Sequence, residues 1–433
     1  MSHQHCHPPI APAIEVEVRE FYDRYPYPRP IDNLEKYRRL WQDQQRRRAD
    51  HHLCWPGRAY KEEQSILVAG CGTSQAAKHA LRRPAAQVTG IDLSATSVRC
   101  TEDLKRRYSL DNLDVRQLPI ERIDELGKRF DQIVCTGVLH HLADPDAGLA
   151  ALRRVLKPDG AMQLMVYAPY GRRGVYMLQQ FCRGIGIHAT DEGIRELIGA
   201  LSWLPPGHPL EILLREAPDF QNAATLADAL LHPQDRAYSV TQLFDLIEKA
   251  ELTFGRWVRQ APYSPYCGVL ANIPRLKHLS RPHQYAAAEL FRGTMVRHSM
   301  VVYRNDNPDN KRQLASFSGD AWLDYVPVRM SDTICVQERL PPGAAAVLIN
   351  QTHTCKDLLM PIDSAEKYLF DAIDGNRSIA DIAARALPSR SANLQHKIAA
   401  DFFERLGQYD QVVFDLSQVH KVSEEIAQML QIV

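Results

Sequence analysis

The stretch from Ser65 to Asp92 constrains the fold of this 433-residue chain most tightly. It opens with the apolar run Ile66–Ala69, which predicts a short strand buried on both faces. Gly70 and Gly72 follow directly. Glycine at these positions allows a sharp turn and lets a ligand approach the backbone closely.

A helix and a second strand complete this stretch. Ser74–Arg82 is predicted to be helical, so the free N–H groups of its first turn open onto the glycines. Gln87–Ile91 is predicted to be the second strand, and Asp92 stands at its end. A carboxylate about 20 residues past the glycines, at the end of a strand, suits two ribose hydroxyls.

Strands and helices continue to alternate downstream, which predicts a parallel sheet with right-handed crossovers. Ser94 can cap the helix that follows the second strand. After Thr136 the chain reads G-V-L-H-H-L, and a K-P-D-G turn precedes the fifth strand. The predicted elements are a helix over Ala95–Tyr108 and strands over Leu113–Leu118, Phe130–Thr136, Ala161–Tyr167, Leu252–Val258 and His298–Arg304.

The ordered set G-C-G-T, I-D, F-D-x-I-V, L-H-H-L and L-K-P-D-G resembles the motifs of the class I S-adenosylmethionine-dependent methyltransferases. The glycines alone would also fit a dinucleotide enzyme or a structural turn. The resemblance implies an α/β fold: a Rossmann-like, doubly wound, mostly parallel sheet of seven strands. Three positions depart from the family pattern, namely Val68 for an acidic residue, Ser74 for a third glycine and Pro119 for an acidic residue after the third strand.

The resemblance also implies S-adenosylmethionine as cofactor and assigns residues to it. The methionine end would lie on the glycine turn, the ribose on the second-strand acid and the adenine against the backbone around Leu118 and Ile120 or against Glu121. The loop after the fourth strand would lie beside the sulfonium. The expected cofactor contacts are Gly70, Cys71, Gly72, Thr73, Asp92, Leu93, Leu118, Pro119, Thr136 and Gly137.

The N-terminal segment is predicted to be a tail followed by a helical lid. Residues 1–13 are expected to be disordered, and Ile14–Tyr25 is predicted to be a helix that ends at the proline-rich run Y-P-Y-P-R-P. Its aromatic residues either plug the domain or cover the bound ligands. On the second interpretation Tyr22 contacts the cofactor and Tyr25 the substrate. Leu34–Asp50 is predicted to be a single basic amphipathic helix.

His140 and His141 follow the fourth strand, where the resembling family has its substrate face. An imidazole titrates near neutrality and can take a proton from a hydroxyl, thiol or amine. The alternative is a structural pair, with one ring capping the next helix and the other packed inside. We prefer His141 as the base.

The segment 169–235 is longer than an ordinary connection and contains several helix-like runs. Long insertions in compact folds usually serve as lids or substrate elements. Tyr167, Tyr170 and Arg172 are expected to line the acceptor pocket, and Arg172 could pair with a carboxylate or phosphate. No metal ligands are expected.

The domain division predicted from the sequence is a tail and lid over 1–60, a methyltransferase-like domain over 61–305, a linker over 306–315 and a second domain over 316–433. The second domain has a winged-helix order of strands and helices, weakly similar to peptide-binding domains of peptide-modifying enzymes. It holds 10 Lys and Arg and 16 Asp and Glu, a balance of −6, which disfavours nucleic acid. We expect a protein contact there, such as a homodimer.

Composition predicts a cytoplasmic protein that binds neither nucleic acid nor membranes. The 52 basic and 52 acidic residues cancel, and no apolar run approaches the length of a membrane helix. Nine scattered cysteines without a C-x-x-C pair indicate reduced thiols and no radical iron–sulfur site. The sequence therefore predicts a methyltransferase acting on a small molecule or a peptide. The alternative is a non-catalytic scaffold or regulatory protein that keeps the same fold.

Overall fold

The computed structural model describes residues 11–211, 214, 222–309 and 315–419 of the chain. These residues form two compact units. The first comprises residues up to 38, 62–253 and 289–304, and the second comprises 39–61, 254–288 and the chain from 305 onward. The domain division predicted from the sequence stays a prediction; in the structure, 39–61 and 254–288 group with the chain from 305 onward.

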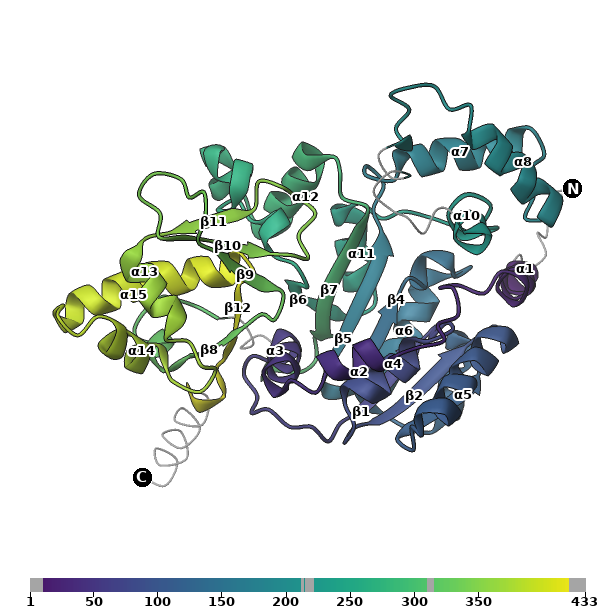
Figure 1. Cartoon of the computed structure of the whole chain (residues 1–433). Helices are drawn as coiled ribbons and strands as arrows, with labels where there is room; N and C mark the ends of the chain where they lie inside the picture. Colours follow the sequence, from purple (N-terminus) through teal and green to yellow (C-terminus); the bar gives the residue numbers. More distant parts are fainter. Residues whose placement is uncertain (1–10, 212–213, 215–221, 310–314, 420–433) are drawn as a thin grey trace, which may run out of the picture. The chain divides into compact units, whose positions relative to one another are not determined.

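A seven-stranded sheet organises the first unit, in the order β3-β2-β1-β4-β5-β7-β6 (Figure 1). The pairs among β1 to β5 are parallel, and β7 runs antiparallel to β5. This confirms the predicted doubly wound, mostly parallel sheet. The strands are β1 (Ser65–Ala69), β2 (Gln87–Asp92), β3 (Leu113–Gln117), β4 (Phe130–Thr136), β5 (Leu156–Tyr167), β6 (Leu252–Trp257) and β7 (Arg297–Arg304).

Helices accompany these strands at the positions expected from the sequence. The Ser94 side chain accepts the N–H of Ser97 and caps the helix that follows β2, as predicted. Helices outside the insertion include α1 (Ala11–Arg24), α4 (Gln75–Arg82), α5 (Ala95–Tyr108), α6 (Pro145–Val155), α11 (Val240–Lys249) and α12 (Arg281–Arg292). The insertion contributes α7 (Arg173–Gly184), α8 (Asp191–Leu201) and α10 (Ala223–Leu230).

The sheet core explains why the first strand was readable from sequence. Ile66, Leu67 and Ala69 have no exposed surface, since helices cover β1 on both faces. Ala76 and Ala80 of α4 pack on one side of this core together with Leu104 of α5. Alanines there bring the helix close to the strands, and this fixes the position of the glycine turn between β1 and α4.

Three local predictions need correction. The predicted helix over 34–50 is two helices, α2 (Glu35–Leu40) and α3 (Gln44–Cys54), because the Asp43 side chain accepts the N–H of Gln45 and caps the second one. Residues 11–13 of the predicted disordered tail belong to α1, and the rest of that tail lies outside the described residues. The K-P-D-G turn is an irregularity within β5: Phe130 pairs with Leu156 and Gln132 with Ala161.

The second unit contains two small sheets and a helical group. One sheet has the order β11-β10-β9 and the other pairs β12 with β8. Phe402 and Phe403 are fully buried in its core. The elements are β8 (Val326–Arg329), β9 (Thr333–Val336), β10 (Ala346–Asn350), β11 (Leu359–Ile362), α13 (Ser364–Asp371), α14 (Ile379–Ala386), α15 (Ala392–Gln408) and β12 (Val412–Asp415). The winged-helix interpretation stays a prediction.

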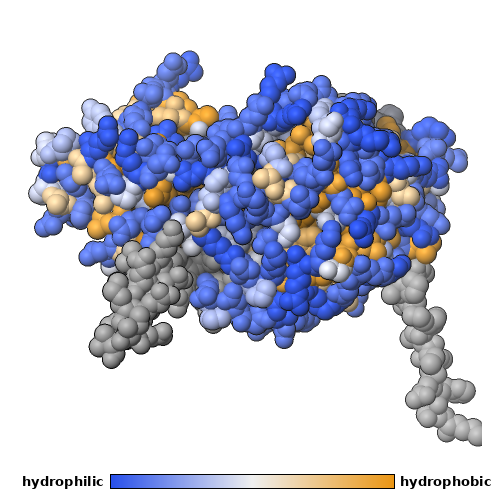
Figure 2. All heavy atoms as spheres, turned by 90° about the horizontal axis from the view of Figure 1, so that it is seen from below, coloured by the Kyte–Doolittle hydropathy of each residue, from blue (hydrophilic) through white to orange (hydrophobic). Residues whose placement is uncertain are grey.

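Figure 2 shows one face of the molecule, where apolar patches are set among hydrophilic residues. Within the part of the chain that the structure describes, no helix combines the length and the apolar character needed to cross a membrane.

Candidate active site

The glycine turn after β1 holds a conformation that favours glycine. Gly70 and Gly72 have φ values of +67° and +54°. The N–H of Gly72 donates to Oδ2 of Asp92 at 2.7 Å, which ties the turn to the end of β2. A Cβ atom on Gly72 would lie 3.0 Å from the carbonyl oxygen of Tyr27 and from the ring of Pro28. The segment that follows α1 therefore packs directly on this turn.

Asp92 retains acceptor capacity toward a ligand. Its Oδ1 accepts the N–H of Ser94 at 2.9 Å, and its Oδ2 is used by Gly72. A carboxylate offers about four lone-pair positions, so about two remain. Burial raises the pKa of Asp92 to about 6, and the N–H bonds from Ser94 and Gly72 oppose that rise. The side chain is half-buried and lines a cavity.

This cavity of about 650 Å³ lies at the carboxyl ends of the central parallel strands. Its volume is within the range of small-molecule sites. Residues that follow β1, β2 and β3 line one side, which we call the nucleoside side; it includes Gly70, Gly72, Asp92, Leu93, Leu118, Pro119, Ile120 and Glu121. Residues from α1, the ends of β4 and β5 and the insertion line the other side, the insertion side; it includes Tyr22, His141, Tyr167, Arg172 and Asp228.

Most of the predicted site residues meet at this cavity. They are Gly70, Gly72, Asp92, Leu93, Leu118, Pro119, Thr136, Gly137, Tyr22, His141, Tyr167 and Arg172. Cys71 and Thr73 do not line it, because their side chains are fully buried. The Thr73 hydroxyl donates to the carbonyl of Pro28 at 2.7 Å. Neither residue has exposed surface toward the cavity, and the N–H of Cys71 donates to the carbonyl of Ile91 at 2.9 Å.

The predicted substrate residues Tyr25 and Tyr170 are placed elsewhere. The hydroxyl of Tyr25 donates to Asp191 at 2.9 Å. Its side chain lines a second cavity, of about 510 Å³, together with residues of α1 and α7. Tyr170 is 39% exposed and lies outside both cavities.

His141 presents one defined ring nitrogen to the cavity. Its Nδ1 lies 2.7 Å from the carbonyl oxygen of Gln234. Since a carbonyl only accepts, Nδ1 carries the proton and Nε2 keeps the lone pair. The ring packs against His232 at a centroid distance of 3.9 Å. The backbone of the insertion thus fixes the tautomer that a proton acceptor needs.

His140, the other histidine of the predicted pair, does not reach the cavity. Its side chain has no exposed surface, and its ring packs 4.0 Å from the ring of Tyr167. Burial lowers the pKa of His140 well below its usual range, and the neighbouring His141 lowers it further. His140 is accordingly a neutral residue packed inside, as the structural alternative describes for one ring of the pair.

Arg172 lines the cavity but already has protein partners. Its guanidinium carbon lies 3.5 Å from the centroid of the Tyr167 ring. One terminal nitrogen lies 3.6 Å from Oδ2 of Asp235, which is also held by the side-chain amide of Gln179. The arginine is 6% exposed. The acid that pairs with it here is therefore a residue of this chain.

Asp228 is the functional candidate that the sequence did not indicate. It lies on α10, is 3% exposed, lines the cavity and accepts the Tyr22 hydroxyl at 3.0 Å. Burial raises the pKa of Asp228, whereas nearby His141, the Tyr22 hydrogen bond and Arg172 lower it. Burial and the Asp228 charge likewise raise the pKa of Tyr22 well above its usual range. No local motif in the insertion could have identified this carboxylate.

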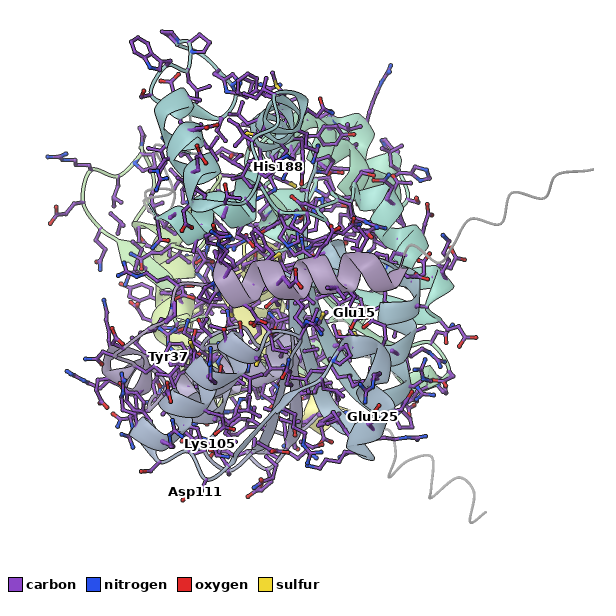
Figure 3. The ribbon with its side chains drawn as sticks, turned by 90° about the vertical axis from the view of Figure 1, so that its right-hand side faces the viewer. Glu15, Tyr37, Lys105, Asp111, Glu125 and His188 are labelled. Atoms are coloured by element: carbon purple, nitrogen blue, oxygen red, sulfur yellow. The ribbon has the colours of Figure 1, made fainter. Side chains whose placement is uncertain are left out.

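The Tyr22–Asp228 hydrogen bond joins α1 to the insertion. In Figure 3, α1 with Glu15 lies between the segment that carries His188 and the part of the sheet unit that carries Lys105 and Glu125. At the end of α1, Asp23 accepts the hydroxyl of Ser94 at 2.7 Å. This helix is therefore held on both sides, where it covers the cavity with Tyr22.

Three possible metal ligands lie within 4.8 Å of one another: one ring nitrogen of His141, one ring nitrogen of His232 and a carboxylate oxygen of Asp228. The Nδ1 of His232 accepts the N–H of Gln234 at 3.0 Å, so its proton is on Nε2. A metal-binding histidine normally donates from its other ring nitrogen. This tautomer of His232 therefore does not fit a metal ligand.

Comparison with known proteins finds a methyltransferase domain within the first unit. Residues 67–162 match the family model described as a methyltransferase domain. An uncharacterized protein of Synechococcus sp. is 35% identical over 196 residues, which are 44% of this chain and 47% of that protein. The ubiquinone biosynthesis O-methyltransferase of Alkalilimnicola ehrlichii is 34% identical over 103 residues, 23% of this chain and 40% of the enzyme. The chain spans less than half the length of these curated relatives.

A solved structure extends the fold similarity to both units of the chain. PKMT2 from Rickettsia typhi superposes with a TM-score of 0.61 at 14% identity, over 86% of this chain and 76% of that protein. The same protein has been solved in complex with AdoHcy (S-adenosylhomocysteine). At this identity the similarity shows a shared fold.

Proposed function

We propose that this chain, which carries the methyltransferase domain of the class I S-adenosylmethionine-dependent enzymes at residues 67–162, transfers a methyl group from that cofactor to an acceptor nucleophile. One observation supports this most. Asp92, tied to the glycine turn through Gly72, keeps lone pairs directed at a cavity of cofactor size at the carboxyl edge of the sheet.

The nucleoside side of the cavity is where the cofactor fits. Asp92 would accept the two ribose hydroxyls, and the glycine turn at Gly70 and Gly72 would hold the amino-acid end. Leu93, Leu118 and Pro119 offer apolar contacts for adenine. Thr136 and Gly137, which follow β4, would then lie beside the sulfonium. These positions follow the order of the strands along the sheet edge.

The insertion side of the cavity is where the acceptor fits. Methyl transfer from a sulfonium is an in-line displacement with a neutral thioether as leaving group, so no acid is needed. The protein contributes mainly by holding nucleophile, methyl group and sulfur in line. His141 would remove the proton of a protonated nucleophile, because its Nε2 carries the lone pair.

Calorimetric titration with S-adenosylhomocysteine tests the cofactor assignment. Wild type should bind one equivalent. Asp92→Ala removes two charge-assisted hydrogen bonds of about 1.5–3 kcal/mol each, which corresponds to a loss in affinity of about 100-fold or more. Asp103→Ala, at an exposed carboxylate of α5, is the matched control and should bind as wild type does. No binding by wild type, or equal binding by Asp92→Ala, would favour the non-catalytic scaffold.

A further inference from the structure

A buried carboxylate without a cationic partner stands on the insertion side of the cavity. Asp228 is 3% exposed and makes one described hydrogen bond, from the Tyr22 hydroxyl. Among the described residues no lysine, arginine or histidine forms an ion pair with it, although the neighbouring acid Asp235 has Arg172. Buried charges in proteins are normally paired. A cationic ligand that enters the cavity could therefore bind beside Asp228.

Other groups around this place favour a cation over an anion. The ring of Tyr22 lines this side of the cavity, and aromatic faces attract cations, whereas the ring of Tyr167 is already covered by Arg172 and His140. The positive charge of Arg172 is offset by Asp235 and faces Tyr167. His141 offers a lone pair, and His232, which contacts His141, is neutral because burial lowers its pKa well below the usual range.

The charge that moves during methyl transfer distinguishes an amine from a hydroxyl acceptor. When a neutral amine attacks, positive charge passes from the sulfur to the nitrogen, and a nearby carboxylate stabilises that change. When a hydroxyl attacks, it must first develop negative charge, which the same carboxylate opposes. An unpaired buried Asp228 therefore selects between these two classes of acceptor.

We infer that the acceptor is an amine, which binds as an ammonium ion to Asp228 and is deprotonated by His141. This inference rests on the proposed methyltransferase function. A ring nitrogen of His141 and a carboxylate oxygen of Asp228 lie within 4.8 Å of each other, so a single ligand nitrogen can hydrogen-bond to both.

The step balances without a further reactant. The ammonium gives one proton to Nε2 of His141, and its nitrogen lone pair then forms the new bond to the methyl carbon. The carbon–sulfur bond breaks, and its electron pair stays on the sulfur of the neutral thioether. The products are a methylated ammonium ion, S-adenosylhomocysteine and one proton, which His141 releases to water.

Binding of simple probes to the protein saturated with S-adenosylhomocysteine tests this inference without knowledge of the natural acceptor. The probes are n-butylamine, which is an ammonium ion at pH 7.5, n-butanol and catechol. Wild type should bind n-butylamine in preference to both hydroxyl compounds. Asp228→Asn, which keeps the shape and the bond from Tyr22, should bind the amine at least tenfold more weakly. Asp103→Asn should behave as wild type does.

Two outcomes would overturn the amine assignment. One is equal amine binding by wild type and Asp228→Asn, and the other is preferential binding of catechol by wild type. Affinity for S-adenosylhomocysteine, measured on the same samples, separates this failure from failure of the proposed function, because Asp228→Asn should leave it within about threefold of wild type. A loss of affinity for S-adenosylmethionine alone would instead show that Asp228 faces the sulfonium.

A turnover assay distinguishes a small-molecule amine from a protein side chain as the acceptor. With radiolabelled S-adenosylmethionine, the wild-type protein is offered spermidine in one arm and an N-acetylated peptide with a single lysine in the other. Methylation of spermidine indicates a small-molecule amine, and methylation of the peptide indicates a protein side chain. Methylation confined to catechol in a third arm would contradict the inference.

Discussion

Asp92 should make the ligand-free protein less stable as the pH rises. Burial raises the pKa of this carboxyl from 3.8 to about 6, so the folded chain holds the proton more tightly than the unfolded chain does. The stability that this tighter binding contributes is present below pH 3.8 and is lost as the pH rises through 6. By linkage, the ionised carboxylate costs about 1 kcal/mol at pH 4.5 and about 3 kcal/mol at pH 7.5.

Asp92→Asn removes this dependence, because an amide does not ionise. The substitution also loses one of the two backbone N–H bonds, but that loss is nearly the same at both pH values and cancels in the comparison. The difference in free energy of unfolding between variant and wild type should therefore move by about 2 kcal/mol in favour of the variant between pH 4.5 and 7.5.

Thermal unfolding of the ligand-free proteins at both pH values measures this shift. For a unit of this size, about 2 kcal/mol corresponds to a change of about 4–8 °C in the Tm difference. Asp103→Asn, at an exposed carboxylate, should show no such change. A Tm difference for Asp92→Asn that stays the same within about 1 °C at pH 4.5 and 7.5 would refute the reasoning, since Asp92 would then not be desolvated in the folded chain.

Three further predictions concern other parts of the chain. Gly72→Ala should lower Tm by several degrees. An alanine at φ +54° is strained by about 1 kcal/mol or more, and its Cβ would lie 3.0 Å from the Tyr27 carbonyl oxygen. An unchanged Tm would contradict this prediction. His141→Ala should lower turnover about 100-fold while S-adenosylhomocysteine binds as before; full turnover would remove His141 as the base. In the second unit, Asp410→Ala should destabilise by about 3 kcal/mol in urea unfolding, because the buried carboxylate accepts the N–H groups of Gln260 and Ala261 and contacts Arg256 and His353; a change below about 1 kcal/mol would argue against this set of contacts.

The fold was predictable wherever local sequence and packing agree. The run Ile66–Ala69 is apolar at every position, and the strand it forms is buried on both faces. The Ser94 side chain caps α5 by accepting the N–H of Ser97, and a cap formed by residues this close together can be predicted from the local sequence. The break between α2 and α3 was missed because Asp43 reads as a residue of a basic helix, although its side chain is a good cap.

The sequence motifs indicated residues on both sides of the cavity, but on the insertion side they did not indicate Asp228. Asp92 follows the glycine turn at a fixed spacing, so its role can be inferred from the motif. Asp228 reaches the cavity from an insertion about 90 residues beyond His141, and its placement depends on how that insertion packs on α1. The same packing brings the carbonyl of Gln234 to the ring of His141, a contact that the sequence did not indicate.

Determination of a crystal structure with bound S-adenosylhomocysteine tests the central claim most directly. The account predicts that the ribose hydroxyls lie within hydrogen-bond distance of the Asp92 carboxylate and that the amino-acid end lies on the glycine turn at Gly70 and Gly72. The sulfur should then face the side of the cavity that holds His141 and Asp228. A cavity that stays empty at saturating ligand, or a ribose bound away from Asp92, would contradict the account.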